Sequence, residues 1–356
     1  MAREKSSPWQ GKVGNPAQVG GIETAVLDNG PAKGARVAWV NTGAGLRYKV
    51  VLDRAMDIAD AFHNQHSLVW LSHGGVTAPR PDVYTGLEWL YTFAGGLVTT
   101  CGLTHVGGPE DDDYGMRGLH GRITNLPATI ESVVQPDLRS GKLDMQITGV
   151  MKQSRVFGPN LELRRTISST LGRPALHIRD VVTNAGNTAM PHMILYHCNF
   201  GWPLADEGTE ILAKGDWKSR GLDMDNAIFN DDRDYHKCPS PLDNHKGGGE
   251  GCAFIDVQAD SDGLCHAGLY NAKLGFAAAM RYKKEQLPWL SNWQHWGPGE
   301  YVTGLEPGTN PPVGQTAARE QGTLIMLDPG ESRTYELEIR VVSERDDIKD
   351  FLAKVR

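Results

Sequence analysis

The chain has 356 residues, of which 40% are hydrophobic and 22% charged, and its formal net charge is −7. This length can bury a sizeable core, and an acidic balance without a basic tract argues against a nucleic-acid or anionic-membrane partner and favours a small neutral ligand. The start, MAREKSSPWQGKVGNP, lacks the apolar core of a signal peptide, and no run approaches the ~18 apolar residues of a membrane helix. We therefore expect a cytoplasmic protein.

Strand patterns dominate the chain. In KLDMQITGV (142–150) apolar residues alternate with polar ones, and ALHIRDVV (175–182) and TYELEIRVV (334–342) alternate in the same way, so each predicted strand has one wet face. The turn signals NAG (184–186) and DPG (328–330) precede strands, and 42 Gly and 20 Pro supply further turns. We predict an all-β fold, a large antiparallel sandwich.

The remaining segments complete this prediction. Only RDDIKDFLAKVR (345–356) has helical spacing, so we expect a short C-terminal helix. The Gly-rich segment CPSPLDNHKGGGEG (238–251) is interpreted as a surface loop. Without a repeat or a convincing linker, residues 1–356 are expected to form a single domain with an N-terminal extension of about 20 residues.

The cysteines are odd in number and widely spaced, which is typical neither of a disulfide framework nor of a CxxC metal site. We expect reduced, buried thiols at all five positions, namely Cys101, Cys198, Cys238, Cys252 and Cys265.

Three of the 12 histidines stand in unusual contexts. His120 lies in GLHGRI between two glycines, which indicates either room for a bound molecule or a tight turn. His197 ends an apolar strand in ILYHCNFGWPL and is followed by Asn199, but a lone histidine on such a strand is usually a core residue. His295 lies in NWQHWG among tryptophans and amides, a mixture that commonly holds sugars, although tryptophan clusters are more often core.

One carboxylate also stands out, in TGLEPGTNP (303–311). Glu306 precedes Pro307 and Gly308, which is typical of a solvated turn. Strand alternation, however, places Glu306 on the same face as Val302 and Gly304. Because glycine in a strand often marks the close approach of a ligand, this carboxylate can also be interpreted as facing a cleft.

Taken in order, several motifs resemble the aldose 1-epimerase (galactose mutarotase) superfamily. They are LHG (119–121), the strand ending in HCNF (197–200), GLEPGTNP (304–311) and the closing strand that begins with DPGES at Asp328. The segment FAGGLVTTCGL (93–103), followed by GLHGRI, is typical of a divergent bacterial branch, and the resemblance extends from about Leu52 to Val342.

The resemblance implies a galactose mutarotase-like β-supersandwich whose open face binds a monosaccharide. It implies that Glu306 is the base that removes the proton of the anomeric hydroxyl and that His197 is the acid that protonates the ring oxygen. His120 would bind substrate hydroxyls. Such acid and base chemistry needs no metal or redox cofactor. The expected partner is a monosaccharide or sugar derivative, and the chain is expected to be a monomer or a homodimer.

Other parts of the sequence depart from the superfamily pattern. The arginine that usually precedes LHG is missing, so Arg122 or Arg54 is a candidate to bind substrate in its place, with a surface salt bridge as the alternative role. Asn199 and His295 are further candidates for substrate binding. A substrate-binding aspartate cannot be placed, because FNDDRDY (229–235) offers several acids without an anchoring motif. This altered pocket predicts an unusual sugar.

Two alternative functions stay open from the sequence. His120, His197, His295 and Glu306 could converge on a divalent metal, which would indicate a metal-dependent isomerase, epimerase or lyase acting on a keto-sugar or sugar acid. The chain could also be a sugar-binding protein without catalysis, since fold does not determine function.

Overall fold

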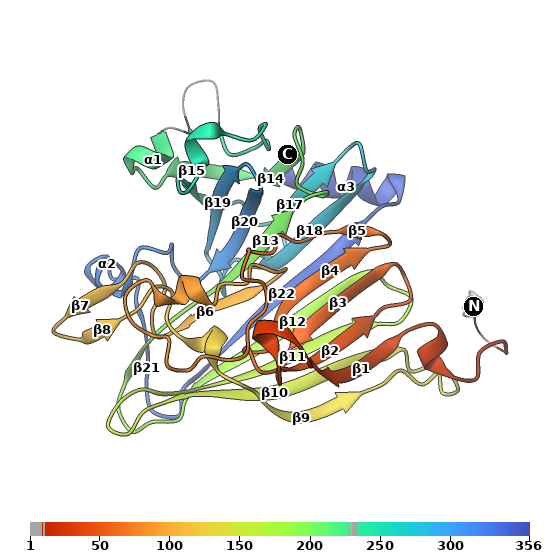
Figure 1. Cartoon of the computed structure of the whole chain (residues 1–356), viewed down its shortest axis with the longest axis horizontal. Helices are drawn as coiled ribbons and strands as arrows, with labels where there is room; N and C mark the ends of the chain where they lie inside the picture. The colour runs from red at the N-terminus through yellow and green to blue at the C-terminus, as the bar shows by residue number, and fades with distance from the viewer. Residues whose placement is uncertain (1–8, 10, 227, 230–233) are drawn as a thin grey trace.

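The computed structural model describes residues 9, 11–226, 228–229 and 234–356, and it is built mainly of antiparallel strands (Figure 1). The predicted all-β class is therefore confirmed. Near the N-terminus, a five-stranded sheet has the order β1-β2-β3-β4-β5. Its strands are β1 (Gly21–Val26), β2 (Arg36–Asn41), β3 (Leu46–Val51), β4 (Asp57–His63) and β5 (His66–Ser67).

The longest strands form an eight-stranded sheet with the order β14-β17-β18-β22-β12-β11-β10-β9. All three strands predicted from alternation, β10, β12 and β22, lie in it. Burial alternates along β12 and β22, but in β10 residues 147–151 are all buried, so the wet face predicted for this strand is wrong over its middle. In sheet order the strands are β14 (Glu210–Ala213), β17 (Leu264–Asn271), β18 (Phe276–Lys283), β22 (Ser332–Val342), β12 (Ala175–Asn184), β11 (Asn160–Thr170), β10 (Asp144–Ser154) and β9 (Thr129–Val134).

A seven-stranded sheet carries HCNF, NWQHWG and the first part of GLEPGTNP. Its main path is β15-β16-β19-β20-β13-β21, and β6 also pairs with β13. A separate two-stranded ribbon is formed by β7 and β8. These strands are β15 (Gly215–Ser219), β16 (Gly251–Val257), β19 (Trp289–Gly297), β20 (Glu300–Gly308), β13 (Met190–Gly201), β21 (Ile325–Leu327), β6 (Thr99–Leu103), β7 (Glu110–Asp112) and β8 (Gly115–Arg117).

The predicted C-terminal helix is confirmed as α3 (Arg345–Val355), which buries Phe351 and Val355. The described residues also contain two short helices that the sequence did not predict, α1 (Asp223–Asn226) and α2 (Gln315–Glu320). Both are too short to show an apolar periodicity. Five 3₁₀ helices complete this part of the chain: η1 (Pro16–Gln18), η2 (Gly30–Ala32), η3 (Glu88–Tyr91), η4 (Ile123–Asn125) and η5 (Asp243–His245).

The core lies between the sheets. A single large hydrophobic cluster includes Tyr48 of β3, Ile178 of β12 and Tyr196 of β13, so it draws on all three large sheets. Beneath it, the side chains of Arg165 and Asp180 form a fully buried ion pair of 2.7 Å. The hydroxyl of Tyr196 donates a hydrogen bond of 2.7 Å to the same carboxylate. This bond ties β13 to the eight-stranded sheet one residue before His197.

Strand β13 separates two apolar layers. Tyr196 and Cys198 face the large cluster, whereas Met193 and Leu195 face a smaller one. The smaller cluster also contains Trp89, Phe93, Cys101, Val106 and Ala318. Most of these come from the segment between β5 and β9, drawn orange to yellow in Figure 1, which packs beside the end of the sheet that carries β13. By strand alternation, His197 lies on this second side.

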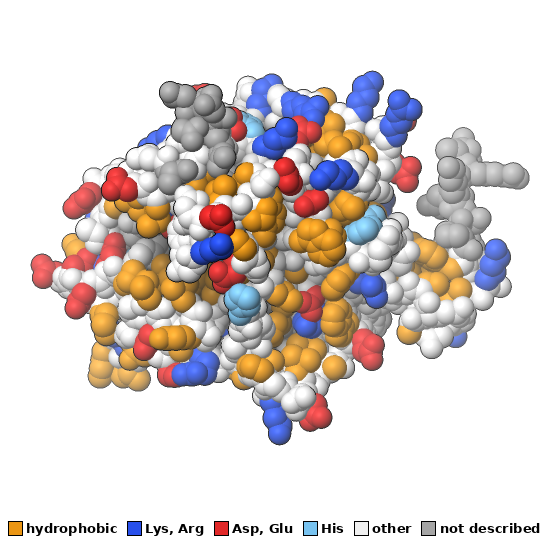
Figure 2. Space-filling view, turned by 45° about the horizontal axis from the view of Figure 1, so that its top comes forward, with side chains coloured by type: hydrophobic (Ala, Val, Ile, Leu, Met, Phe, Trp, Pro, Cys, Tyr) orange, Lys and Arg blue, Asp and Glu red, His pale blue; other side chains and the backbone are white. Residues whose placement is uncertain are grey.

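The charge distribution on the surface and the burial of the cysteines agree with what the sequence predicted. On the face shown in Figure 2, acidic and basic side chains are interspersed with apolar ones and form no single-sign field. All five cysteines are buried and free, as expected. Within the described part of the chain, no helix has the length and apolar character that crossing a membrane requires. The single-domain expectation stays a prediction, and residues 1–8 and 10 of the N-terminal extension lie outside the described residues.

Candidate active site

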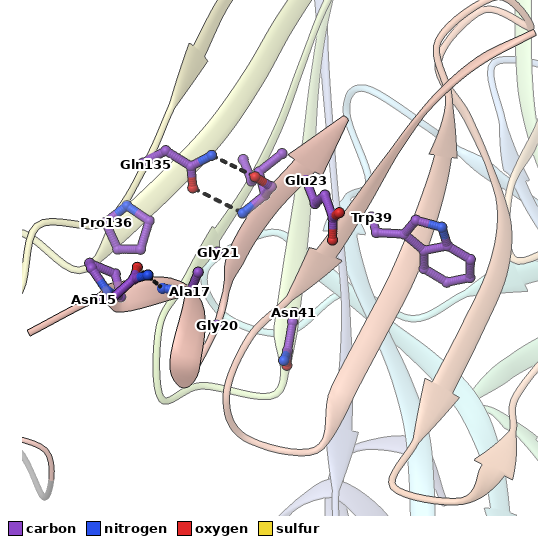
Figure 3. Close-up of a pocket in the computed structure, with 11 residues that line it drawn as sticks. Asn15, Ala17, Gly20, Gly21, Glu23, Trp39, Asn41, Gln135 and Pro136 are labelled. Atoms are coloured by element: carbon purple, nitrogen blue, oxygen red, sulfur yellow. Dashed lines mark hydrogen bonds between the residues drawn. The ribbon is translucent and has the colours of Figure 1, made fainter. Parts of the chain in front are cut away.

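Two cavities of similar volume differ in chemistry. One, of about 320 Å³, lies beside β1 and the end of β9 (Figure 3). There the Gln135 side chain donates to the backbone oxygen of Ile22 (2.6 Å) and accepts from its N–H (2.9 Å), so its amide is already used. Among its described lining residues only Glu23 is titratable. This cavity offers no acid and base pair.

The second cavity, of about 330 Å³, lies on the seven-stranded sheet and is the candidate active site. Its size falls at the lower end of the roughly 300–1,000 Å³ typical of small-molecule sites. Its lining includes three residues proposed from the sequence, His120, His197 and Glu306. We call it the site cavity.

The register of β13 and β20 brings the proposed acid and base together. Leu195 pairs with Gly308 and Cys198 with Leu305, and the same antiparallel register places His197 opposite Glu306. Directly opposed residues have neighbouring side chains. Nε2 of His197 is accordingly 3.2 Å from Oε1 of Glu306.

Gly304 makes room for the carboxylate. The strand continues through Pro307 to Gly308 and does not end at Glu306 in a solvated turn. As the alternation predicts, Gly304 and Glu306 share a face, and a Cβ at Gly304 would collide with Oε1 of Glu306. On the neighbouring strand β19, Trp293 pairs with Gly304, so its indole borders the same space.

Burial determines the ionisation of this pair. Both side chains are nearly inaccessible, with 6% of His197 and 2% of Glu306 exposed. Burial raises the pKa of Glu306 well above its usual 4.5, nearby Glu250 raises it further, and Arg220 lowers it. Burial also lowers the pKa of His197 from 6.5 to about 3. Burial therefore favours a protonated Glu306 carboxyl beside a neutral His197 imidazole. In this form the two side chains together hold one proton that can be transferred between them.

Aromatic rings enclose His197 on several sides. Ring centroids of Phe93, Trp293 and His120 lie 5.1, 5.4 and 6.0 Å from that of His197. Trp89 stacks on Phe93 at 4.4 Å. Such rings suit the C–H faces of a sugar and also exclude water from the imidazole.

His120 sits in a strained turn at the edge of this enclosure. Its φ is +54°, and Gly121 beside it has φ +71°. A Cβ at Gly118 would collide with the backbone of Tyr84, and one at Gly121 with that of Gly102. The two glycines are thus needed for the close approach of neighbouring backbone segments. They do not make room for a ligand. The imidazole nevertheless lines the site cavity, and burial lowers its pKa well below 6.5.

Several buried polar atoms of the lining have no hydrogen-bond partner among the described residues. They are Nε1 of Trp89, Nδ1 of His120, Nδ1 of His197 and Oε1 of Glu306, whose contact with His197 lacks hydrogen-bond geometry. Since buried polar groups are normally satisfied, this concentration of unpaired atoms around one cavity is typical of a ligand site.

Arg220 and Glu250 also line the site cavity, and the sequence did not identify either. Arg220 donates to Glu250 (2.7 Å) and to both carboxylate oxygens of Asp225 (2.8 and 3.1 Å). The indole N–H of Trp293 donates to the other oxygen of Glu250 at 2.7 Å. This network holds both charged side chains at the cavity wall.

Four residues proposed to bind substrate do not line the site cavity. Arg54 is buried elsewhere and donates to Thr77, Thr92 and Thr124, so the expected surface salt bridge is also wrong for it. Arg122 lies against the ring of Tyr84, 5.5 Å from its centroid. The amide of Asn199 donates to the backbone oxygens of Gly96 and His197.

His295 is the fourth. Its Nδ1 donates to the backbone oxygen of Gly249 (2.6 Å), and its ring stacks behind Trp293 at 6.4 Å. His295 therefore supports Trp293 and the backbone beside Glu250 and does not itself line the cavity. Of the two tryptophans beside it, Trp296 is fully buried in the core and only Trp293 lines the site cavity.

The position of His295 also bears on the metal alternative. Because His295 turns away, the four proposed ligands do not converge. Across the described residues, no group of three or more His, Cys, Asp or Glu side chains is arranged to hold a metal ion.

The sequence signal for the missed residues was weak. Glu250 lies in the Gly-rich segment 238–251, which was expected to be a surface loop. His245 in this segment is nevertheless buried, and Glu250 lines the site cavity. Phe93 is the first residue of the branch-specific segment 93–103. That segment was the only sequence signal for the aromatic rings around His197. Of the acids in FNDDRDY, Asp231 and Asp232 lie outside the described residues.

The raised pKa of Glu306 predicts a pH-dependent cost to stability. Above pH 4.5 the unfolded chain ionises this carboxyl while the folded chain retains its proton, so stability falls as pH rises toward the folded pKa. Glu306→Gln removes this cost. In thermal unfolding we expect the variant to match the parent near pH 4.5 and to exceed its Tm by roughly a few degrees near pH 8.

The exposed Glu285→Gln is the matched control for this experiment, and its Tm difference from the parent should not grow with pH. If the difference in Tm between Glu306→Gln and the parent stays constant or shrinks from pH 4.5 to 8, the raised pKa of Glu306 is contradicted.

Comparisons with known proteins agree with this fold. A protein from Klebsiella pneumoniae, provisionally described as an aldose 1-epimerase, is 24% identical; the match covers 94% of this chain and 86% of that one, with a TM-score of 0.83. A galactose 1-epimerase from Lactobacillus acidophilus is 12% identical, covering 91% and 99% of the two chains, with a TM-score of 0.59. A galactose mutarotase-like protein from Clostridium acetobutylicum is 11% identical, covering 91% and 98%, with a TM-score of 0.58.

At these identities the likenesses show the fold alone, and the predicted galactose mutarotase-like fold is confirmed. No curated protein sequence matches the chain. The family match spans residues 32–341, which is most of the length, and this chain therefore belongs to the family described as "Domain of unknown function (DUF4432)".

Proposed function

We propose that the protein interconverts the anomers of an aldose by acid and base catalysis at the site cavity. The observation that carries the proposal is the buried pair of His197 and Glu306, whose reactive atoms lie 3.2 Å apart at an aromatic-lined cavity. Ring opening removes a proton from O1 and delivers one to O5. Both oxygens are bonded to C1, so the base and the acid have to be side by side.

One titrating proton on the pair is sufficient for this reaction. In ring opening, one member takes the proton of the O1 hydroxyl while the other gives a proton to O5, and the bond between C1 and O5 breaks. The C1–C2 bond then rotates, and the aldehyde closes by the reverse transfers on its other face. The pair ends with the number of protons with which it began.

The direction of the pKa shifts bears on which member is the acid. The superfamily resemblance assigns Glu306 as the base and His197 as the acid, which requires the proton to be on His197. Burial favours the proton on Glu306. A sugar hydroxyl that donates to the Glu306 carboxylate would stabilise the charged pair and move the proton to His197. This is a role for the substrate itself.

The remaining polar residues of the site cavity are suited to hold hydroxyl groups. Arg220 has five N–H donors and uses three of them on Asp225 and Glu250, which leaves two available. Glu250 accepts hydrogen bonds, and His120 also presents its imidazole to the cavity. We assign substrate binding to these three residues.

Exchange spectroscopy by NMR on a panel of aldoses, keto-sugars and uronic acids tests the proposal. We expect at least one aldose to exchange its anomers faster with the protein than without it, and Glu306→Gln to abolish the acceleration. Binding without acceleration would instead indicate a sugar-binding protein. Irreversible consumption of a panel member, or conversion only after a metal is added, would indicate an isomerase or lyase.

A further inference from the structure

His295 lies directly behind the part of the site cavity that Trp293 and Glu250 line. Strand alternation places Trp293, His295 and Gly297 on one face of β19. Trp293 lines the cavity, whereas His295 does not, although only 11% of its side chain is exposed. His295 is therefore separated from a ligand by one layer of residues.

The imidazole of His295 is packed against two other rings. It is nearly parallel to the indole of Trp293, with an angle of 9° and centroids 6.4 Å apart, and it stacks on His245 with centroids 5.4 Å apart. A Cβ at Gly297 would come within 3.0 Å of Nε2 of His295, so the glycine lets the ring lie close to the backbone. The position of the ring is therefore fixed by its surroundings.

Glu250, in contrast, follows a stretch of backbone that has no side chains. Residues 247–249 are three glycines with φ of +73°, +151° and +95°, and ordering glycine costs more conformational entropy than ordering any other residue. Two hydrogen bonds reach this stretch. The N–H of Gly248 donates to the oxygen of His245 over 3.4 Å, and the oxygen of Gly249 accepts from Nδ1 of His295 at 2.6 Å. The shorter bond holds the residue directly before Glu250.

The contacts of Glu250 lead back to the strand that carries His295. One carboxylate oxygen of Glu250 accepts from Nε1 of Trp293 at 2.7 Å, and the other accepts from Arg220 at 2.7 Å. Arg220 thus holds the tip of the Glu250 side chain, and His295 holds the backbone from which that side chain starts. Because Trp293 is two residues from His295 on β19, the contacts form a closed ring that fixes the carboxylate relative to the indole.

We propose that His295 is a positioning residue, whose hydrogen bond to Gly249 holds the Glu250 carboxylate against the indole of Trp293 and so preforms this part of the site cavity. The inference rests on the proposed function only in that Glu250 binds substrate hydroxyls. His295 contacts neither the substrate nor the pair of His197 and Glu306. Its loss should therefore weaken sugar binding and leave the proton transfers unchanged.

Two substitutions separate the hydrogen bond of His295 from its ring packing. His295→Phe keeps a planar ring beside Trp293 but cannot donate to Gly249. His295→Asn removes the ring, but its Nδ2 is bonded to Cγ as Nδ1 of histidine is, so it can donate from the same position. Both substitutions lose the 3.5 Å contact between Nε2 and Glu300, which therefore does not distinguish them.

We expect His295→Phe to raise the KM and the Kd for the sugar roughly five- to ten-fold, the usual effect of one lost hydrogen bond, and to change kcat by less than about two-fold. His295→Asn should stay within about two-fold of the parent in all three quantities. His236→Phe is the control. His236 also stacks on a ring, that of Tyr235 at 4.0 Å, but it does not line the cavity, and its variant should match the parent.

The indole N–H of Trp293 gives a readout that does not depend on turnover. Its NMR signal is identified by its absence in Trp293→Phe, and its exchange with water reports how often the bond to Glu250 opens. We expect this exchange to be at least roughly five-fold faster in His295→Phe and close to the parent rate in His295→Asn. All measurements are made well below the Tm of every variant.

The indole measurement allows the two proposals to fail separately. If no sugar exchanges its anomers faster with the protein, the proposed function fails, but faster indole exchange confined to His295→Phe still supports the role of His295. Three results would overturn that role: a parent-like indole exchange rate in His295→Phe, equal changes in the two His295 variants, or a loss in kcat that exceeds the rise in KM. A lower Tm of His295→Phe with unchanged indole exchange would show that His295 only stabilises the fold.

Discussion

Glu306→Gln is expected to lower the rate of enzyme-catalysed anomer exchange by at least about 10²–10⁴-fold, the range that a positioned proton-transfer group contributes. The amide keeps the shape of the carboxyl but cannot accept the proton of the O1 hydroxyl. Because Glu306 is 2% exposed and seated over Gly304, no water can easily take its place. Polarimetry on freshly dissolved sugar, corrected for spontaneous mutarotation, measures the effect.

Two controls separate lost chemistry from lost structure. The Glu306→Gln protein should bind the sugar with an affinity near that of the parent and unfold at least as cooperatively at pH 7. The exposed Glu285→Gln should retain the parent rate. A Glu306→Gln variant that keeps full activity would remove this residue from the mechanism.

His197→Asn is expected to produce the second large loss, again at least about 10²-fold, and the loss should appear in kcat more than in KM. An amide cannot exchange a proton with O5, but it can still donate a hydrogen bond to that oxygen in the ground state. A group used mainly in the transition state changes kcat and kcat/KM together. Steady-state polarimetry over a range of sugar concentrations distinguishes the two parameters.

An exposed histidine provides the control for this variant. His177 lies on β12 of the other sheet with about half of its side chain exposed, and His177→Asn should retain both parameters. If His197→Asn raises KM and leaves kcat unchanged, His197 only binds the sugar, and the acid must be another group.

The sequence was sufficient for the fold class because β-strand patterning is local. Alternation along 142–150, 175–182 and 334–342 predicted three strands, and all three exist as β10, β12 and β22; β12 and β22 also have the alternating burial, whereas β10 is buried on both faces over residues 147–151. The same local rule placed Gly304 and Glu306 on one face. It also predicted α3 from its apolar spacing, whereas α1 and α2 were missed because four and six residues cannot show a period.

The ordered motifs determined the resemblance to the aldose 1-epimerase superfamily and, through it, the candidates Glu306, His197 and His120. All three line the site cavity. The roles that the resemblance implies for them stay predictions. Arg54 and Arg122 were proposed only as replacements for a missing motif arginine, Asn199 because it follows His197, and His295 because of its aromatic and amide neighbours. None of these arguments says where a side chain points. Sequence reasoning therefore could not tell that four of its candidates lie outside the cavity, namely Arg54, Arg122, Asn199 and His295.

Only the tertiary structure decided the geometry and the electrostatics of the site. The contact between His197 and Glu306 depends on the pairing register of β13 and β20, which are separated by six intervening strands in the chain and whose pairing no local pattern reveals. Burial, which shifts both pKa values, is a property of the packed sheets and not of either residue. Arg220 and Glu250, 30 positions apart, become one charged network only when β15 and β16 pair and bring their ends together.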